Sequence, residues 1–442
     1  MAKRSVTVGC GAGFAGDRME PAVELARSGG VDFVGLECLA ERTLVTGLME
    51  RAANPARGYD RRLERRLGPL VPAAMANGCG IVSNLGSANP YAAVERIVAL
   101  CRANSLPGIT VAALVGDDLS GHLEDVVWEG DPLEEGGQWL GAHAYLGVEG
   151  MAEAFRQGAS IVVTGRVADS SLFAAPAIAA LDLGTEALAG ALTAGHLLEC
   201  GGQLTGGNLA ATQGRQLCAR ELANLGYPTA MIELDGSFVL GVLDGKPARL
   251  DVVGTTLQLL YEVHDPRLYH TPDLTLDFGE LLLEEVGENR VRVTGARGAG
   301  RPETLKAIGF VKRPGEVADV EITYAGEGAV ARAMVARDVL RERVELLGLR
   351  DYAVDLVGID SVLGAVACLP PGYAPPELRV HISARCTEAE EAQAVEDEVY
   401  ALTLSGPAGG ASLRSERRPH VSVVSGRVAR SLVNVSVEYQ VS

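Results

Sequence analysis

Short runs of apolar residues alternate with longer helical patterns through the first half of the chain. The runs VDFVGLE and ITVAALVG are hydrophobic almost throughout, which is typical of strands that are buried on both faces. We expect strands at residues 5–8, 31–37, 80–83, 109–115 and 160–164. Helical patterns lie between them at residues 19–28, 61–77, 91–103 and 147–157. This order predicts a Rossmann-like parallel sheet with helices on both faces.

The hydrophobic pattern changes near residue 227, where strands begin to follow one another in pairs. The stretch AMIELDGSFVLGVLDG has apolar runs on either side of Asp235 and Gly236, which is typical of a β-hairpin. We expect further strands at residues 290–294, 318–324 and 378–384, two more near the C-terminus, and helices at residues 329–347 and 388–405. The sequence therefore predicts an α/β domain at residues 1–226 and an α+β domain with a mixed or antiparallel sheet at residues 227–442.

Composition narrows the classes of function. The 442 residues carry a formal net charge of −18, and such a chain repels nucleic acid and anionic membranes. No apolar run has the length of a transmembrane helix, and the eight cysteines have no paired spacing. We therefore expect a cytoplasmic protein that binds neither nucleic acid nor membrane. A small anionic ligand would need a locally basic pocket.

A glycine-rich loop follows the first predicted strand. It contains a G-x-G-x-x-G pattern formed by Gly11, Gly13 and Gly16. Glu37 ends the second predicted strand at the distance where a dinucleotide-binding protein places the acidic residue that contacts ribose. Asp17 and Arg18 follow the last glycine, however, and an Asp17 carboxylate would compete with phosphate for the N–H groups of the loop. A dinucleotide site, a site for another anion and a purely structural turn all stay open.

Residues that directly follow the other strands are candidates for chemistry, because ligands of parallel sheets bind at the carboxyl ends of the strands. Glu37 is a candidate general base, and Arg42 is a candidate clamp for an anionic group. Arg166 follows a buried strand, so its charge needs a partner or a ligand. Asp169 either holds Arg166 or caps the next helix.

Two further loops combine polar side chains with glycine. Asn84 and Asn89 lie in SNLGSANP, and helix capping alone would explain Asn89. The turn CGGQLTGGN supplies further candidate anion contacts at Thr205, Gly206, Gly207 and Asn208. The histidines form no pattern typical of a metal site, so we expect no histidine-ligated metal. A Mg²⁺ ion at the adjacent Asp117 and Asp118 stays open.

Seven motifs occur together in this chain: GCGAGFAGDR, LECLAERTL, SNLGSANP, VTGRVADSSLF, CGGQLTGGN, YHTPDLTLDF and GPAGG. In this order they resemble the acyclic terpene utilisation protein family over nearly the whole chain. The resemblance implies a role in pathways of organic acids and acyl-CoA thioesters and makes a typical NAD dehydrogenase less favoured. Longer family members carry an additional C-terminal ferredoxin-like segment, so the resemblance also implies a small ferredoxin-like subunit as a candidate partner.

Taken together, the residues and the resemblance favour an enzyme that acts on a carboxylic acid or an acyl-CoA thioester. We expect lyase, hydratase or isomerase chemistry, with Glu37 or Asp169 as the base and with Arg166 and Arg42 holding the carboxylate. Such a site requires no redox cofactor, and the sequence identifies none. Two alternatives stay open: an NAD(P)- or FAD-dependent oxidoreductase, and a non-catalytic subunit of an acyl-CoA-processing complex. A homo-oligomer is the expected assembly.

Overall fold

The structure is a computed structural model that describes residues 4–181, 183–209, 214–368, 370 and 372–442. The chain forms two compact units. The first contains Met1–Gly130, Leu140–Gly309 and Val423–Ser442, and the second contains Asp131–Trp139 and Phe310–Ser422. The division expected after residue 226 falls inside the first unit.

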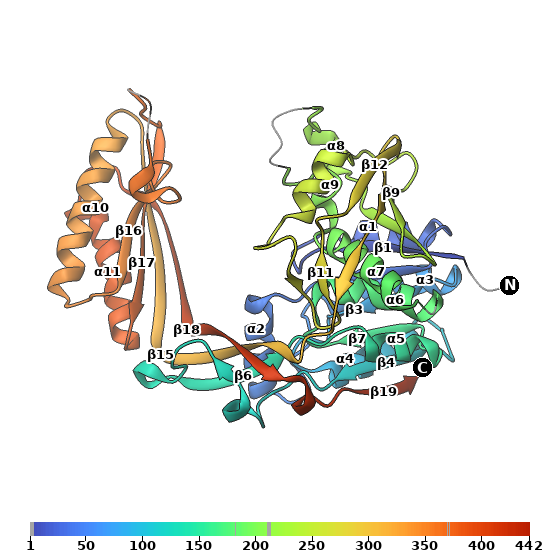
Figure 1. The fold of residues 1–442 in the computed structure, drawn as a ribbon. Helices are drawn as coiled ribbons and strands as arrows, with labels where there is room; N and C mark the ends of the chain where they lie inside the picture. Colours follow the sequence, from blue (N-terminus) through green and yellow to red (C-terminus); the bar gives the residue numbers. More distant parts are fainter. Residues whose placement is uncertain (1–3, 182, 210–213, 369, 371) are drawn as a thin grey trace. The chain divides into compact units, whose positions relative to one another are not determined.

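The described residues of the first unit build one mixed sheet of ten strands. Their order is β12 (Leu282–Gly287), β13 (Arg290–Thr294), β9 (Phe238–Val242), β8 (Pro228–Glu233), β1 (Ser5–Ala12), β2 (Phe33–Leu36), β3 (Gly80–Ser83), β7 (Ile161–Thr164), β4 (Thr110–Val115) and β19 (Ser436–Val441). Strands β1, β2, β3, β7 and β4 are parallel, and the flanking strands pair antiparallel. In Figure 1 β19 lies beside β4, although the two are far apart in sequence.

The five strands expected in the first half therefore form the parallel part of this sheet. A mixed α/β protein with parallel strands is confirmed, whereas the closer Rossmann-like arrangement is not. Strand β1 lies at one end of the parallel group, but the Rossmann order 3-2-1-4-5-6 places the first strand near the centre. The short strands β10 (Tyr269–His270), β11 (Thr275–Asp277) and β14 (Arg297–Ala299) form a separate small sheet.

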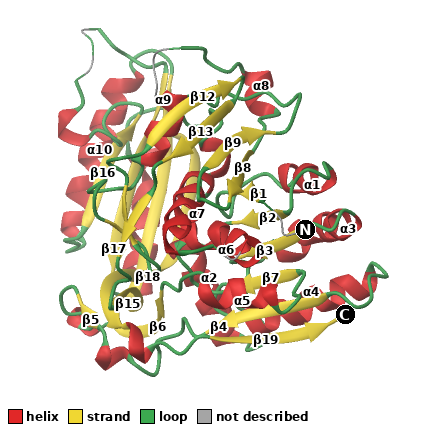
Figure 2. Ribbon diagram, turned by 45° about the vertical axis from the view of Figure 1, so that its right-hand side comes forward, coloured by secondary structure: helices red, strands yellow, loops and turns green. Residues whose placement is uncertain are grey.

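Helices cover both faces of the parallel strands because the strand residues alternate between two cores. Val111 and Ala113 of β4 face one core with α1 (Glu20–Arg27), α3 (Leu63–Ala76) and α4 (Pro90–Ala103). Ala112 and Leu114 face the other core with α5 (Glu149–Arg156), α6 (Asp169–Leu181) and α7 (Thr185–Leu198). Figure 2 shows α1 and α3 on one side of β1–β3 and α6 and α7 on the other. Two-sided burial explains the continuous hydrophobic runs.

The remaining elements of the first unit lie in the connections. They are α2 (Glu41–Ala53), α8 (Ala219–Ala223), α9 (Val252–Leu259), β5 (Val127–Trp128) and the single-turn helices η1 (Leu123–Asp125), η3 (Gly201–Gln203) and η5 (Arg430–Leu432). The other single turns are η2 (Glu134–Gly136) and η4 (Gly364–Val366), and β6 (Gln138–Ala144) pairs with β15 (Thr304–Ala325). Within the described parts of the chain, no helix combines the length and the apolar character needed to cross a membrane.

The second unit has the element order strand, helix, strand, strand, helix, strand. Its elements are the later part of β15, α10 (Ala329–Leu346), β16 (Tyr352–Val357), β17 (Glu377–Cys386), α11 (Ala389–Ser405) and the first part of β18 (Ala411–Ala429). The strands lie in the order β16-β17-β15-β18, and β17 pairs antiparallel with both β15 and β16. This is the ferredoxin-like pattern. Apolar residues of both helices and three strands form its core.

Candidate functional site

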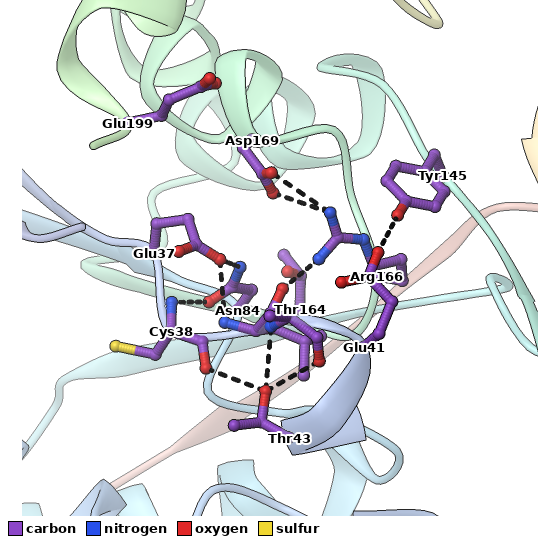
Figure 3. A network of polar contacts seen from close by, with 12 residues as sticks. Glu37, Cys38, Glu41, Thr43, Asn84, Tyr145, Thr164, Arg166, Asp169 and Glu199 are labelled. Carbon is purple, nitrogen blue, oxygen red and sulfur yellow. Dashed lines mark hydrogen bonds and ion pairs between the residues drawn. The ribbon is translucent and has the colours of Figure 1, made fainter. Parts of the chain in front are cut away.

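Polar residues follow four of the five parallel strands in the first unit. Glu37 follows β2, Asn84 follows β3, Gly116 and Asp117 follow β4, and Gly165 and Arg166 follow β7. Parallel strands end at the same edge of a sheet, so these side chains come together there. Figure 3 shows the resulting network of polar contacts around Glu37, Asn84, Arg166 and Asp169.

Glu37 lies in this network, and the residue is only 8 % exposed. Its Oε1 atom accepts a hydrogen bond from the Leu39 N–H at 2.8 Å and one from Nδ2 of Asn84 at 2.9 Å. Burial raises the pKa of Glu37 from 4.5 to about 8, with a contribution from the nearby Asp169, while Arg166 and Asn84 act in the opposite direction. At neutral pH this group therefore exchanges a proton readily.

Asn84 fixes the orientation of Glu37. Its side chain is fully buried, and while Nδ2 donates to Glu37, Oδ1 accepts a hydrogen bond from the Cys38 N–H at 2.6 Å. The amide thus connects two adjacent residues at the end of β2. An aspartate at this position would lack the donor and would place a second carboxylate against Glu37. Asn84 is a positioning residue for Glu37.

Arg166 is the buried cation of the site, with 5 % exposure. Its guanidinium group donates to Oδ1 and Oδ2 of Asp169 at 3.0 and 3.2 Å and also to the carbonyl of Leu39. The Nε atom is buried and has no partner within the described residues. Burial alone would lower the pKa of Arg166, but Asp169 and the other acids raise it, so the guanidinium stays charged.

Asp169 is the first residue of α6, and of the two roles expected for it the structure shows the contact with Arg166. It begins a helix, where a carboxylate is favourable, and it holds Arg166. Burial raises the pKa of Asp169, and Arg166 counteracts that rise. The two acids Glu37 and Asp169 therefore lie near the same buried guanidinium, and Lys306 adds positive charge near Asp169. Two carboxylates in one such environment favour the retention of a proton by one of them.

Three further residues lie near Arg166 that the sequence did not predict as site residues, namely Glu41, Tyr145 and Lys306. The Tyr145 hydroxyl donates to Oε1 of Glu41 at 3.2 Å. Two cations contact the Tyr145 ring, with the Arg166 guanidinium 4.1 Å and the Lys306 ammonium 4.7 Å from its centroid. Burial alone would raise the pKa of Glu41, but backbone hydrogen bonding and the charge of Arg166 lower it.

Glu37 and Glu41 are thus two glutamates near one arginine whose environments move their pKa values in opposite directions. Such separation is typical of sites where one carboxyl group transfers protons and another stays ionised. Glu41 stood in the sequence motif LECLAERTL, but only Glu37 at the strand end carried a positional signal. Lys306 comes from β15 and Tyr145 follows β6, so neither position could be linked to the site from local patterns.

Two buried histidines are also part of this region. His143 Nδ1 lies 2.8 Å from Oδ2 of Asp117, and the same oxygen accepts a hydrogen bond from the backbone N–H of Arg166 at 2.7 Å. His196 Nδ1 lies 3.1 Å from Oε1 of Glu199, whose side chain is drawn beyond Asp169 in Figure 3. Burial raises the pKa of Glu199, and His196 opposes the rise. Neither histidine was singled out in the sequence, because each lies in an apolar segment without a motif.

The glycine-rich loop at residues 11–16 is packed against the chain itself. Gly11 lies inside β1, and a Cβ atom on Gly13 would lie 2.4 Å from the backbone carbon of Cys200. The N–H of Gly13 donates to Oδ2 of Asp17 at 2.9 Å. The Asp17 carboxylate thus occupies an N–H group of the loop that a phosphate would use. Asp17 also accepts a hydrogen bond from the Tyr227 hydroxyl.

The remaining predicted residues lie apart from the network. Asn89 caps α4 by accepting from the Ala92 N–H at 3.3 Å, and its Nδ2 donates to two carbonyls. Thr205 is fully buried and donates to the Gly226 carbonyl at 2.7 Å, while the N–H groups of Gly206 and Gly207 bond within their own turn. Asn208 donates to Oε1 of Gln203. The exposed side chain of Arg42 makes no ion pair within the described residues. Their roles in ligand binding stay predictions.

Metal binding finds no obvious ligand set here. Among the described residues, no group of three or more His, Cys, Asp and Glu side chains is arranged to hold a metal ion. Asp118 points to Arg51, with 3.2 Å between NH1 and Oδ2, whereas Asp117 faces His143. Burial raises the pKa of the Cys38 and Cys200 thiols, which disfavours the thiolate form at neutral pH.

Comparison with known proteins gives one match. A family model described as acyclic terpene utilisation family protein AtuA matches residues 6–439. No curated protein and no solved structure matches the chain. The match includes the strand ends that carry Glu37, Asn84, Arg166 and Asp169 and extends through the ferredoxin-like second unit.

Proposed function

Since the chain belongs to the acyclic terpene utilisation family AtuA, we propose that it is an enzyme of organic-acid or acyl-CoA metabolism that removes a proton next to a carbonyl group. Lyase, hydratase and isomerase reactions share this step. One observation carries the proposal: the buried Glu37 carboxyl, held by Asn84, lies at the same strand-end edge as the buried Arg166 guanidinium. A base and a cation at one edge are what enolate formation requires.

In the proposed step, the Glu37 carboxylate takes the proton from the carbon next to the substrate carbonyl. The electron pair of that C–H bond forms the carbon–carbon double bond of an enolate, and negative charge develops on the carbonyl oxygen. Arg166 and Lys306 supply positive charge near that oxygen. Protonated Glu37 then returns its proton to another atom, either a second carbon in an isomerisation or a leaving group in an elimination.

The three acids around Arg166 have different roles in the proposed step. Glu41 stays ionised and accepts a hydrogen bond from the Tyr145 hydroxyl, so it keeps the ring in place over Arg166. Asp169 orients the guanidinium from the other side through two hydrogen bonds. Asp169 is the alternative base, because its pKa is also raised. Glu37 is favoured as the base because both hydrogen bonds that orient it end on Oε1, so they leave Oε2 for the substrate proton.

A direct test is exchange of substrate hydrogen with solvent deuterium. The protein is incubated in D₂O with a panel of acyl-CoA thioesters and the corresponding free acids, and deuterium incorporation is measured by mass spectrometry. We expect incorporation next to the carbonyl, with a loss of about a hundredfold or more in Glu37→Gln. Asp319→Asn in the second unit is the matched control and should exchange as the wild type does.

Two outcomes would contradict the proposal. Exchange that proceeds at the wild-type rate in Glu37→Gln would exclude Glu37 as the base, and the same experiment with Asp169→Asn would then identify the alternative. A thermal shift with NAD(P) or FAD, without any exchange, would favour the oxidoreductase interpretation instead. The absence of both exchange and ligand stabilisation would favour a non-catalytic subunit.

A further inference from the structure

The surface beside the glycine-rich loop carries a group of arginines in a strongly acidic chain. We call it the loop arginine cluster, and it consists of Arg18, Arg62, Arg65 and Arg66. Arg18 follows the loop, and the other three lie in the first turns of α3 or directly before it. The whole chain has a formal net charge of −18, so a local excess of positive charge is unusual here.

Contacts with the loop bring the members of the cluster together. Arg62 and Arg66 donate to the same acceptor, the carbonyl of Ala15, and Arg66 also donates to the Asp17 carbonyl at 3.0 Å. Arg66 NH1 lies 3.5 Å from the Arg18 carbonyl. Arg65 is exposed and lies three residues from Arg62 on the helix. The guanidinium groups of Arg62 and Arg66 therefore hold the backbone at residues 15–18, next to Arg18 and Arg65.

No carboxylate forms an ion pair with any of the four arginines within the described residues. Arg18 donates to the Leu222 carbonyl at 2.6 Å, and the nearby Asp60 accepts from the backbone N–H of Arg62. Two other arginines of this surface behave differently, since Arg61 pairs with Glu50 and Arg96 pairs with Glu64. Burial raises the pKa of Asp60, and the charges of Arg66 and Arg62 oppose that rise, but no carboxylate among the described residues is in direct contact with the exposed guanidinium groups of Arg18 and Arg65.

This arrangement is costly unless an anion joins it. Like charges three or four residues apart on a helix repel one another. Arg66 is only 3 % exposed, and its Nε atom is buried without a partner, so it adds a charge that solvent screens poorly. Arg62, Arg65 and Arg18 are exposed and keep free N–H groups, which suit the oxygen atoms of phosphate.

An exposed aromatic side chain completes the surface. Phe14 lies on the loop and is 59 % exposed. Its carbonyl oxygen lies 3.9 Å from the thiol of Cys38, the residue that follows Glu37 in the sequence. A ring of this kind stacks on a nucleotide base. We propose that Phe14 and the loop arginine cluster bind the phosphorylated adenosine end of a coenzyme A thioester. This inference rests on the proposed function and adds to it the site that selects acyl-CoA over free acids.

The test is binding of adenosine 3′,5′-bisphosphate, which carries phosphates and base but no reacting group, measured by calorimetry. We expect Arg62→Ala and Arg65→Ala each to weaken binding roughly tenfold, and high salt to weaken it further. Arg61→Ala is the matched control, because this neighbouring arginine is already paired, and it should bind like the wild type. Glu37→Gln should also bind normally, since the fragment does not reach the base.

Arg65→Ala removes an exposed side chain that forms no hydrogen bond with the described part of the chain, so the test stays valid even where Arg62→Ala alters the loop. The inference would be overturned if Arg62→Ala, Arg65→Ala and the wild type all bound the fragment with the same affinity. Inorganic phosphate or NAD that binds as tightly as the fragment, with the same arginine dependence, would overturn the assignment to coenzyme A. In each of these cases deuterium exchange that depends on Glu37 would leave the proposed function intact.

Discussion

The strand-end edge of the first unit and the open face of the second-unit sheet both combine arginines with carboxylates, but they do so in different surroundings. In the second unit, apolar residues of β15 and β17 face the two helices, and the alternate positions form the other face. That face carries Arg379 paired with Glu321, and Arg418 and His381 paired with Asp319. These side chains are half-buried or exposed and remain in contact with water.

The comparison teaches that burial, more than pairing, gives an ion pair its chemistry. Both regions place arginines next to acids, yet the pKa of Glu37 rises to about 8 because burial outweighs Arg166. At Asp319, burial acts in the same direction, but a hydrogen bond from Ser383 and the charge of Arg418 outweigh it and lower the pKa. A proton donor or acceptor that works near neutral pH arises only in the first case.

The largest expected effect comes from removing the buried cation. Arg166→Ala leaves Asp169 and the Leu39 carbonyl without their donor in a poorly solvated region. We expect the free energy of unfolding to fall by about 3 kcal/mol, the lower end for a broken buried pair, because the Asp169 side chain is one-third exposed. Denaturant unfolding measures this loss. Arg166→Lys should restore part of the stability. An unfolding midpoint that is unchanged in Arg166→Ala would contradict the conclusion that the Arg166 charge stabilises Asp169 and the Leu39 carbonyl.

The next effect concerns the dependence of stability on pH. The folded protein holds one more proton on Glu37 than the unfolded chain between about pH 4.5 and pH 8. Stability is therefore fully present below the unfolded pKa and falls as the pH rises through this window, by up to about 1.4 kcal/mol per pH unit from this group. Glu37→Gln stays neutral, so its melting temperature should fall less than that of the wild type between pH 5.5 and pH 8.5.

Asp319→Asn in the second unit should show the opposite sign. Because the folded state lowers the pKa of Asp319, its carboxylate stabilises the fold above the unfolded pKa, and this contribution is lost as the pH falls through the folded pKa. The variant should be less stable than the wild type at neutral pH and should approach it under acid conditions. Melting temperatures of Glu37→Gln and Asp319→Asn, measured over the same pH series, compare the two regions. If both variants changed with pH in the same direction relative to the wild type, the proposed difference between the two regions would be contradicted.

Much of the strand-end site could be predicted from the sequence. Continuous apolar runs identify parallel strands, and the residue after each run must then lie at the common edge, which points to Glu37, Asn84 and Arg166. Tyr145 and Lys306 could not be found in this way. They approach from segments outside the parallel strands, and only the tertiary structure brings them to the Arg166 guanidinium.

The limits of the fold prediction have a similar cause. The hairpin of β8 and β9 was identified from its turn, but a hairpin pattern does not tell which sheet it joins. It pairs with β1, so the first unit continues beyond residue 226. Likewise β19 pairs with β4 across more than three hundred residues of sequence. In the second unit both helices and the strands at residues 318–324 and 378–384 were expected, whereas β16 was not, and the ferredoxin-like order depends on non-local pairings that no local pattern encodes.

The smallest expected effect is the one that completes the comparison. Arg379→Ala removes the arginine opposite Glu321 on the open face, where the two side chains are 35 % and 21 % exposed. Water solvates the remaining carboxylate, so we expect the free energy of unfolding to change by less than about 1 kcal/mol and deuterium exchange to be unaffected. Unfolding measured side by side with Arg166→Ala should therefore show a difference of several-fold between two substitutions of the same kind. If Arg379→Ala proved as damaging as Arg166→Ala, burial would not be the property that distinguishes the two regions, and the argument for Glu37 and Arg166 as the reactive pair would lose its physical basis.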